Sequence, residues 1–353
     1  MDSYRIMMLG PSGSGKTVYL ASLFQEFSTQ GEWGFFLGAD HKARKRLNEI
    51  FTEIVIGKKW PAATLLKGDA EDWVFTCSIN KDRKTFDVCQ FVYIDYAGAR
   101  LTASDIEDEF FNQKLESADI LLGLLDGARI CALMRNEDEG NYWFYIDLKN
   151  LIDIMMKNVT KPIHFVISKW DLVESEGYSL KEVREKLLEK KAFKNLVVTR
   201  KKNRAITRLI PVSSVGKGFA EPLEDGSMKK TPGKEPEPFQ VEVPLACVLP
   251  DLIQNEKEEL ARRKSQEEER STTVTASLNW REKFLQWIPR TTWAESAEEK
   301  KREAQEISEE LRQQKADALN AIDDEASALE YVFNCFILIQ NKFYIDCPHS
   351  DLP

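Results

Sequence analysis

The stretch that decides the fold is GPSGSGKT, residues 10–17, which follows the apolar run YRIMML at residues 4–9. It matches the pattern G-x-x-x-x-G-K-[ST] and stands where a strand would pass into a helix. Backbone N–H groups of such a loop wrap phosphates, and the dipole of the following helix favours their negative charge. The pattern predicts a phosphate-binding loop in which Lys16 reaches the β- and γ-phosphates and the Thr17 hydroxyl binds Mg²⁺.

Composition limits the classes of protein that the chain can belong to. It has 353 residues, 42% of them hydrophobic, and a net charge of −9. The length suits about two domains with a full α/β core, and the negative charge excludes a chain-wide basic footprint for nucleic acid. The longest apolar stretch, near residues 328–339, falls short of the ~20 residues of a membrane-spanning helix. Six scattered cysteines without a C-x-x-C pair indicate thiols in a reducing compartment. With no signal peptide ahead of the first strand, we expect a cytoplasmic protein without a nucleic-acid partner.

Apolar segments alternate with amphipathic ones up to about residue 255. Near-continuous apolar strands between helices are typical of an α/β fold, with a mostly parallel sheet covered on both faces. Ligands of such sheets bind at the carboxyl ends of the strands, so the residues just after each strand are the candidate site. The predicted strands after the first are 72–79, 86–95, 118–127, 162–171 and 207–214, and the first two helices are 17–27 and 40–54.

The sequence DYAG, residues 95–98, stands at the end of one predicted strand. An aspartate there can hold Mg²⁺ through water, and a glycine N–H can approach the γ-phosphate because no Cβ interferes. A D-x-x-G alone arises often by chance. Its place after an apolar strand downstream of the phosphate loop favours a metal role for Asp95 and a γ-phosphate contact at Gly98.

Two further strand ends carry residues suited to a purine base, SKWD at 168–171 and SSVG at 213–216. The Asp171 carboxylate can accept hydrogen bonds from N1–H and N2–H₂ of guanine, and adenine offers no such pair of donors. Lys169 can lay its aliphatic stem over the base, and backbone N–H groups of 213–216 can meet guanine O6. Each motif alone is explained by a strand-end turn with a capping Ser or Asp. Together they favour a guanine nucleotide.

With these four motifs, residues 3–255 resemble the Ras-like GTPase domain of the translation-factor-related (TRAFAC) class of P-loop GTPases. The resemblance implies GTP and GDP as ligands, Mg²⁺ as cofactor and action through switch loops. Ser168 stands where that family has Asn or Thr, and its hydroxyl can still tie the base motif to the phosphate loop. A weaker resemblance, carried by GKKWPAAT, YIDYAG and EPFQVEVPLACVL, links the chain to the double-GTPases of bacterial conflict systems, without establishing a defence role.

The family also has a threonine before D-x-x-G that closes over Mg²⁺ and the γ-phosphate. Thr64, in WPAAT, is the candidate, and the alternative is an ordinary loop threonine. Many Ras-like GTPases place a water-orienting Gln after D-x-x-G, whereas this chain has Ala99 and then Arg100. Hydrolysis is therefore expected to be slow alone, or to use another residue or a partner.

The resemblance assigns roles to residues of all these motifs. Catalytic roles fall to Lys16, Thr64 and Gly98. Metal ligation falls to Thr17, Thr64 and Asp95. Nucleotide contacts fall to Gly13, Ser14, Gly15, Lys16, Thr17, Ser168, Lys169, Asp171, Ser213 and Ser214.

We expect two domains, a GTPase domain at 1–255 and an α-helical extension at 256–353. Residues 216–242, rich in Pro, Gly and charge, predict a long flexible loop before a helix that Pro250 either kinks or begins. A second long helix is predicted from 295 to about 340, forming an antiparallel arm with the first and packing its C-terminal half on the GTPase domain or on the preceding helix. Between them, residues 280–293 crowd Trp280, Trp287 and Trp293 beside basic residues. That tip either folds into a small core, binds a protein partner or, less favoured in an acidic chain, contacts a membrane.

The sequence thus favours a GTP-binding, Mg²⁺-dependent switch that acts on a protein effector or regulator. One alternative is a P-loop ATPase or small-molecule kinase, because GPSGSGKT also occurs there. Another is a non-hydrolysing GTPase-like scaffold whose helical arm binds a partner or membrane.

Overall fold

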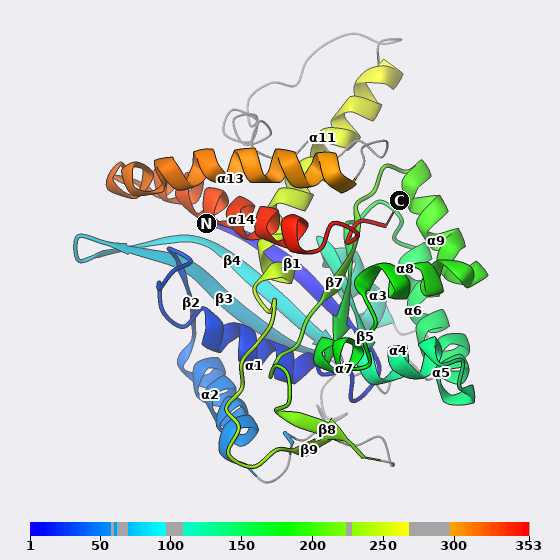
Figure 1. The fold of residues 1–353 in the computed structure, drawn as a ribbon. Helices are drawn as coiled ribbons and strands as arrows, with labels where there is room; N and C mark the ends of the chain where they lie inside the picture. Colours follow the sequence, from blue (N-terminus) through cyan, green and yellow to red (C-terminus); the bar gives the residue numbers. More distant parts are fainter. Residues whose placement is uncertain (58–59, 62–69, 97–108, 224–227, 268–296, 353) are drawn as a thin grey trace.

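Seven strands form the central sheet of the computed structural model, in the order β2-β3-β4-β1-β5-β6-β7 (Figure 1). The structure describes residues 1–353 except 58–59, 62–69, 97–108, 224–227, 268–296 and 353. Strand β1 pairs in parallel with β4 and β5, and β5, β6 and β7 continue in parallel, whereas β3 runs antiparallel to both β2 and β4. The strands are β1 (Asp2–Leu9), β2 (Phe36–Ala39), β3 (Ala70–Lys81), β4 (Lys84–Tyr96), β5 (Ile120–Asp126), β6 (Ile163–Ser168) and β7 (Thr207–Pro211).

Both faces of this sheet are buried. Successive residues of a strand point to opposite faces, and on β1 the side chains of Ile6 and Met8 join one core while Met7 and Leu9 join the other. The first core contains α1 (Lys16–Glu26), α2 (His41–Ile56), α10 (Val243–Ala246), α11 (Val248–Glu267), α13 (Ala297–Asn320) and α14 (Glu325–Asp346). The second contains α3 (Glu109–Ser117), α4 (Gly127–Met134), α5 (Asp138–Trp143), the π-helix η2 (Phe144–Leu148), α6 (Lys149–Met156), α7 (Trp170–Ser175), α8 (Leu180–Glu189) and α9 (Lys191–Lys202). The predicted α/β fold, mostly parallel with helices on both faces and at the C-terminus, is confirmed.

Two parts of the sheet region differ from the prediction. Strand β2, a four-residue edge strand, was not predicted. Residues 216–242 carry more structure than the predicted flexible loop, because they contain a hairpin of β8 (Ala220–Pro222) and β9 (Met228–Lys230). Further on, Ser213 and Phe239 exchange two backbone hydrogen bonds of 3.0 and 2.8 Å. Backbone pairing gives this polar stretch the order that its composition does not predict.

The C-terminal region also differs, because the single helix predicted over 295–340 is two helices. Asp324 breaks it with a capping box, in which its Oδ1 accepts from Ser327 N at 2.8 Å and Ser327 Oγ accepts from Asp324 N at 3.2 Å. Helices α13 and α14 lie side by side (Figure 1), so the antiparallel pair is α13 with α14 and not α11 with one long helix. Phe333 and Phe336 of α14 join the first core, which confirms that this end packs on the sheet domain. Pro250 lies in the first turn of α11, where a proline is tolerated.

A buried polar network joins α11 and α14 to the sheet. Arg208 on β7 donates to Asp251 on α11, with Nε 2.5 Å from Oδ2, and His164 Nε2 on β6 lies 2.7 Å from the same oxygen. Tyr344 on α14 contacts the Arg208 guanidinium. Burial alone would raise the pKa of Asp251, but the charge of Arg208 lowers it. The network therefore holds a carboxylate, ionised and fully paired, between the sheet and its covering helices.

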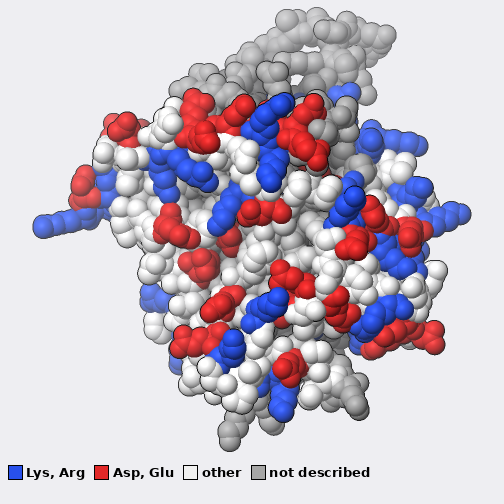
Figure 2. Space-filling view, viewed as in Figure 1, with Lys and Arg blue, Asp and Glu red and all other residues white. Residues whose placement is uncertain are grey.

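The surface carries charges of both signs. Lys and Arg are interspersed with Asp and Glu over the face drawn in Figure 2. Within the described residues, no helix has both the length and the apolar character needed to cross a membrane. All six cysteines are free thiols.

Candidate nucleotide-binding site

The phosphate loop, residues 10–17, joins the end of β1 to the start of α1. Gly13 and Gly15 have φ of 82° and 91°, values that side-chain-bearing residues rarely adopt. Gly15 is the N-cap residue of α1 and supplies no side-chain cap, as expected where the helix N-terminus is to meet an anion. A Cβ on Gly10 would lie 2.8 Å from Ser14 Oγ and 3.2 Å from Leu124 O. The glycines of the motif are therefore required by the loop's own geometry.

Lys16 lies across the loop that it belongs to. Its side chain is buried, and Nζ donates to Gly10 O at 2.7 Å and to Pro11 O at 3.3 Å. Burial lowers the pKa of Lys16, and the nearby charge of Asp95 opposes that effect. The ammonium group is thus held over the loop interior, where a phosphate would replace the two carbonyls as its partner.

Two side chains with oxygen ligands suited to Mg²⁺ lie at the end of the phosphate loop and on the neighbouring strand β4. Thr17 lies in the first turn of α1, and Asp95 lies at the end of β4, in register with Met8 of β1. Asp95 is 1% exposed. A hydroxyl and a carboxylate are the hard ligands that Mg²⁺ prefers, so these two residues fit the predicted metal. The other predicted residues at this end, Thr64 and Gly98, lie outside the described residues.

The predicted base end of the candidate site is organised around Asp171, in the first turn of α7. Its carboxylate is buried, and Oδ1 accepts from Ser213 Oγ at 2.6 Å. Ser213 Oγ in turn accepts from Gly216 N at 2.9 Å, which joins Asp171 to the base loop, residues 213–216. Burial raises the pKa of Asp171, and the hydrogen bond from Ser213 opposes this. The structure therefore brings together the two base motifs that the sequence places far apart.

Lys169 is held by residues that the sequence did not mark as part of the site. It has φ 52° and ψ 40°, and its Nζ donates to Asp126 Oδ2 at 2.6 Å. Asp126 also caps α4 by accepting from Ala128 N at 2.9 Å. A Cβ on Gly127 would lie 2.5 Å from both the Ser168 and Lys169 carbonyl oxygens. The Asp-Gly pair that ends the apolar run 118–127 was the signal for this role.

The base and phosphate halves of the site meet through serines. A Cβ placed on Gly15 would lie 3.9 Å from Ser168 Cβ, so the base motif borders the phosphate loop. The Ser168 hydroxyl was predicted to bond to the phosphate loop, but it donates to Leu125 O at 3.2 Å. The reason is that Ser168 ends β6, which pairs with β5, the strand of Leu125. Ser22 of α1, which the sequence did not single out, donates to Ser214 O at 2.7 Å. This bond joins the helix of the phosphate loop to the base loop.

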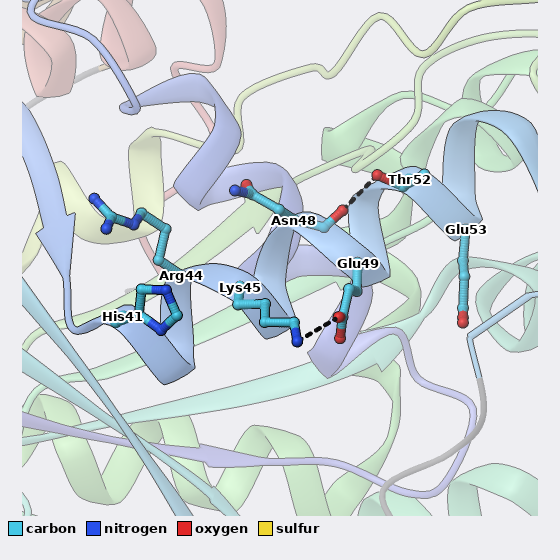
Figure 3. A pocket seen from close by; sticks show the side chains of 7 residues that line it. All are labelled: His41, Arg44, Lys45, Asn48, Glu49, Thr52 and Glu53. Carbon is cyan, nitrogen blue, oxygen red and sulfur yellow. Dashed lines mark hydrogen bonds and ion pairs between the residues drawn. The ribbon is translucent and has the colours of Figure 1, made fainter.

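Two shallow hollows run along α2 beside this site. The side chains lining one of them all come from that single helix (Figure 3), and they bond among themselves: Lys45 Nζ lies 3.8 Å from Glu49 Oε1, and Thr52 Oγ1 donates to Asn48 O at 2.7 Å. The second is lined by residues of α2 together with Thr17 and Pro61. Only the second reaches the metal end of the candidate site.

The fold and the loop geometry define a P-loop α/β protein. No protein-family model matches the sequence, and no match was found among curated proteins. Among solved structures, it is similar to the FeoB G-domain from Methanococcus jannaschii, at 15% identity and a TM-score of 0.30, over 61% of this chain and 88% of the other. Chains that superpose so loosely cannot be aligned residue by residue, so the site rests on the geometry of this chain.

Proposed function

We propose that the protein is a GTP-binding, Mg²⁺-dependent molecular switch that hydrolyses GTP slowly. The observation that carries the proposal is the buried Asp171 carboxylate, fixed by Ser213 at the end of the sheet that also holds the phosphate loop. A carboxylate in this place favours guanine, whose two adjacent donors can pair with it, and disfavours adenine, which would leave the acceptor sites that face the base unpaired.

The proposed roles follow the two ends of the site. Lys16 stabilises charge on the β- and γ-phosphates, and Thr17 with Asp95, the latter through water, would hold Mg²⁺, which neutralises developing phosphate charge when bound. Lys169, steadied by Asp126, covers the base. We propose further that Thr64 and Gly98 sense the γ-phosphate and that segments 60–66 and 98–110 are the switches that relax when it is lost. Residues 1–255 would form the switch, and 256–353 a helical extension.

Slow hydrolysis follows from the residue after D-x-x-G. Ala99 has no group to orient the attacking water. A supplied arginine or water-positioning group is worth roughly 10³–10⁵ in rate in this chemistry. We therefore propose that a protein partner, acting as effector or regulator, completes the reaction.

Two other functions are separated from this one by a single assay. A P-loop ATPase or kinase would turn over ATP, and a non-hydrolysing scaffold would turn over neither nucleotide. The test is single-turnover release of phosphate from GTP and from ATP by the purified chain, with Lys16→Ala as control. We expect slow turnover of GTP alone, abolished in Lys16→Ala. Faster release from ATP, or equal release by Lys16→Ala, would contradict the proposal.

A further inference from the structure

The β8–β9 hairpin follows the base loop and lies against the far end of α2. Trp60, three residues beyond the Gly57 that caps α2, donates from Nε1 to Met228 O at 2.6 Å. Its ring also makes an edge contact with Phe219, with ring centroids 6.2 Å apart. The hairpin therefore holds Trp60 by both its polar and its apolar parts.

Lys230 of β9 strengthens this attachment. Its Nζ donates to Gly57 O at 2.9 Å and to Glu53 O, two carbonyls at the C-terminus of α2. It also lies 5.0 Å from the centroid of the Trp60 ring. A cation is favoured there by the helix dipole and by the free acceptor capacity of carbonyls at a helix C-terminus. One side chain thus contacts both the helix end and the tryptophan that follows it.

The chain beyond the hairpin is bonded to the base loop. Thr231 N donates to Phe219 O at 2.8 Å and extends the pairing of the hairpin, and Glu237 N, further along the chain, donates to Val215 O of the base loop at 2.9 Å. A Cβ on Gly216 would lie only 2.0 Å from Glu237 O, so the two segments are in close contact. Backbone bonds thus join the base loop to the segment that contains the hairpin, and the side chains of Lys230 and Trp60 join the hairpin to the end of α2.

We propose that the hairpin is a brace that fixes the point at which the first switch segment leaves α2, with Lys230 and Trp60 as positioning residues. The proposal rests on the proposed GTP switch. A segment anchored at its start loses less conformational freedom when the γ-phosphate orders it. GDP has no γ-phosphate, so its binding does not require that ordering. The brace therefore favours the GTP-bound form selectively, and its contact with the base loop makes Trp60 respond to guanine binding.

The decisive variant is Lys230→Met, which keeps the length of the side chain and removes its donor. Its matched control is Lys229→Met, a change at an exposed lysine of the same strand. Affinities for GDP and for a non-hydrolysable GTP analogue are measured with Mg²⁺ on the full chain. Without the anchor, about one more residue has to be ordered when the analogue binds, which predicts about a tenfold fall in analogue affinity for Lys230→Met. GDP affinity, and both affinities of the control, should stay within about twofold.

A second readout follows Trp60 itself. In chains labelled with 5-fluorotryptophan, its ¹⁹F resonance is assigned by its absence in Trp60→Phe. We expect GDP to shift this resonance in the wild type and not in Lys230→Met. The brace proposal would be overturned if Lys230→Met lost affinity equally for GDP and the GTP analogue, or if it bound both as Lys229→Met does. It would also be overturned if GDP did not shift the Trp60 resonance of the wild type. A wild type that binds neither nucleotide would instead refute the proposed function, and the brace with it.

Discussion

Replacing Asp171 by Asn should exchange the base preference of the site. Asparagine keeps the size of the side chain but presents an N–H₂ where the carboxylate accepted a hydrogen bond. Against guanine this sets donor against donor. Against xanthine, whose C2 bears a carbonyl in place of the amino group, the same amide finds an acceptor. GTP and GDP should therefore bind more weakly, and the xanthosine nucleotides more tightly.

The size of the effect follows from the surroundings of Asp171. The residue is only 6% exposed, and its Oδ1 is tied to Ser213 Oγ, which is itself held by Gly216 N. The side chain therefore cannot turn away to relieve the mismatch. A hydrogen bond to a charged group contributes about 1.5–3 kcal/mol, and the stranded donor costs about as much again. A loss of roughly 3–6 kcal/mol corresponds to a fall of about 10²–10⁴ in GDP affinity.

The assay is competition of GDP and XDP against a fluorescent guanine nucleotide, for the wild type, Asp171→Asn and the control Glu174→Gln. Glu174 lies on the same helix and is exposed, and its ion pair with Lys217 is a loose 3.7 Å. The control should bind GDP like the wild type. Wild-type GDP affinity in Asp171→Asn, or a loss of GDP with no gain of XDP, would refute the assignment of Asp171 to the base.

Three further predictions concern the stability of the protein, the pH dependence of GDP binding and the role of residues 279–293. Arg208→Met leaves Asp251 buried without its main partner, so the free energy of unfolding should fall by about 3–5 kcal/mol and the melting temperature by about 4–7 °C; a change of about 1 °C would show that the network contributes little. Burial raises the pKa of Asp171, so the carboxylate is fully ionised only above that raised pKa. GDP affinity should therefore decline as the pH falls, and the decline should begin above the ordinary Asp pKa of about 3.9. Calorimetry from pH 7.5 downward tests this, and an equal decline for XDP binding to Asp171→Asn would assign the effect to another group. Deletion of residues 279–293, which lie outside the described residues, should leave GTP affinity and basal turnover intact while abolishing partner binding; loss of GTP binding would make that stretch part of the core.

The strand-end residues were predictable because their signals are local. The phosphate loop carries its own glycines, and Asp171 and Ser213 each follow an apolar strand, so parallel pairing brings them to one edge. Strand β2 was missed because four residues containing a glycine give no periodicity to detect. The break at Asp324 was missed although a signal for it was present, because Asp is a preferred N-cap residue at the start of a helix. The apolar stripe on either side of Asp324 favoured one continuous helix.

Other features depend on contacts that no local pattern encodes. Asp126 supports Lys169 only because β5 and β6 are neighbours in the sheet. The ordering of residues 216–242 depends on pairing with the base loop and on the attachment of Trp60, which lies more than 150 residues earlier. A Pro-, Gly- and charge-rich stretch looks the same in sequence whether or not such partners exist.

Selection of guanine over adenine by the candidate site can be measured on the purified protein. Isothermal titration of the purified 353-residue chain with GDP and with ADP, both with Mg²⁺, compares nucleotides that differ only in the base. We expect GDP to bind at least about 100-fold more tightly, because ADP leaves the buried Asp171 carboxylate without the two donors of guanine. Equal affinities, or a preference for ADP, would contradict it.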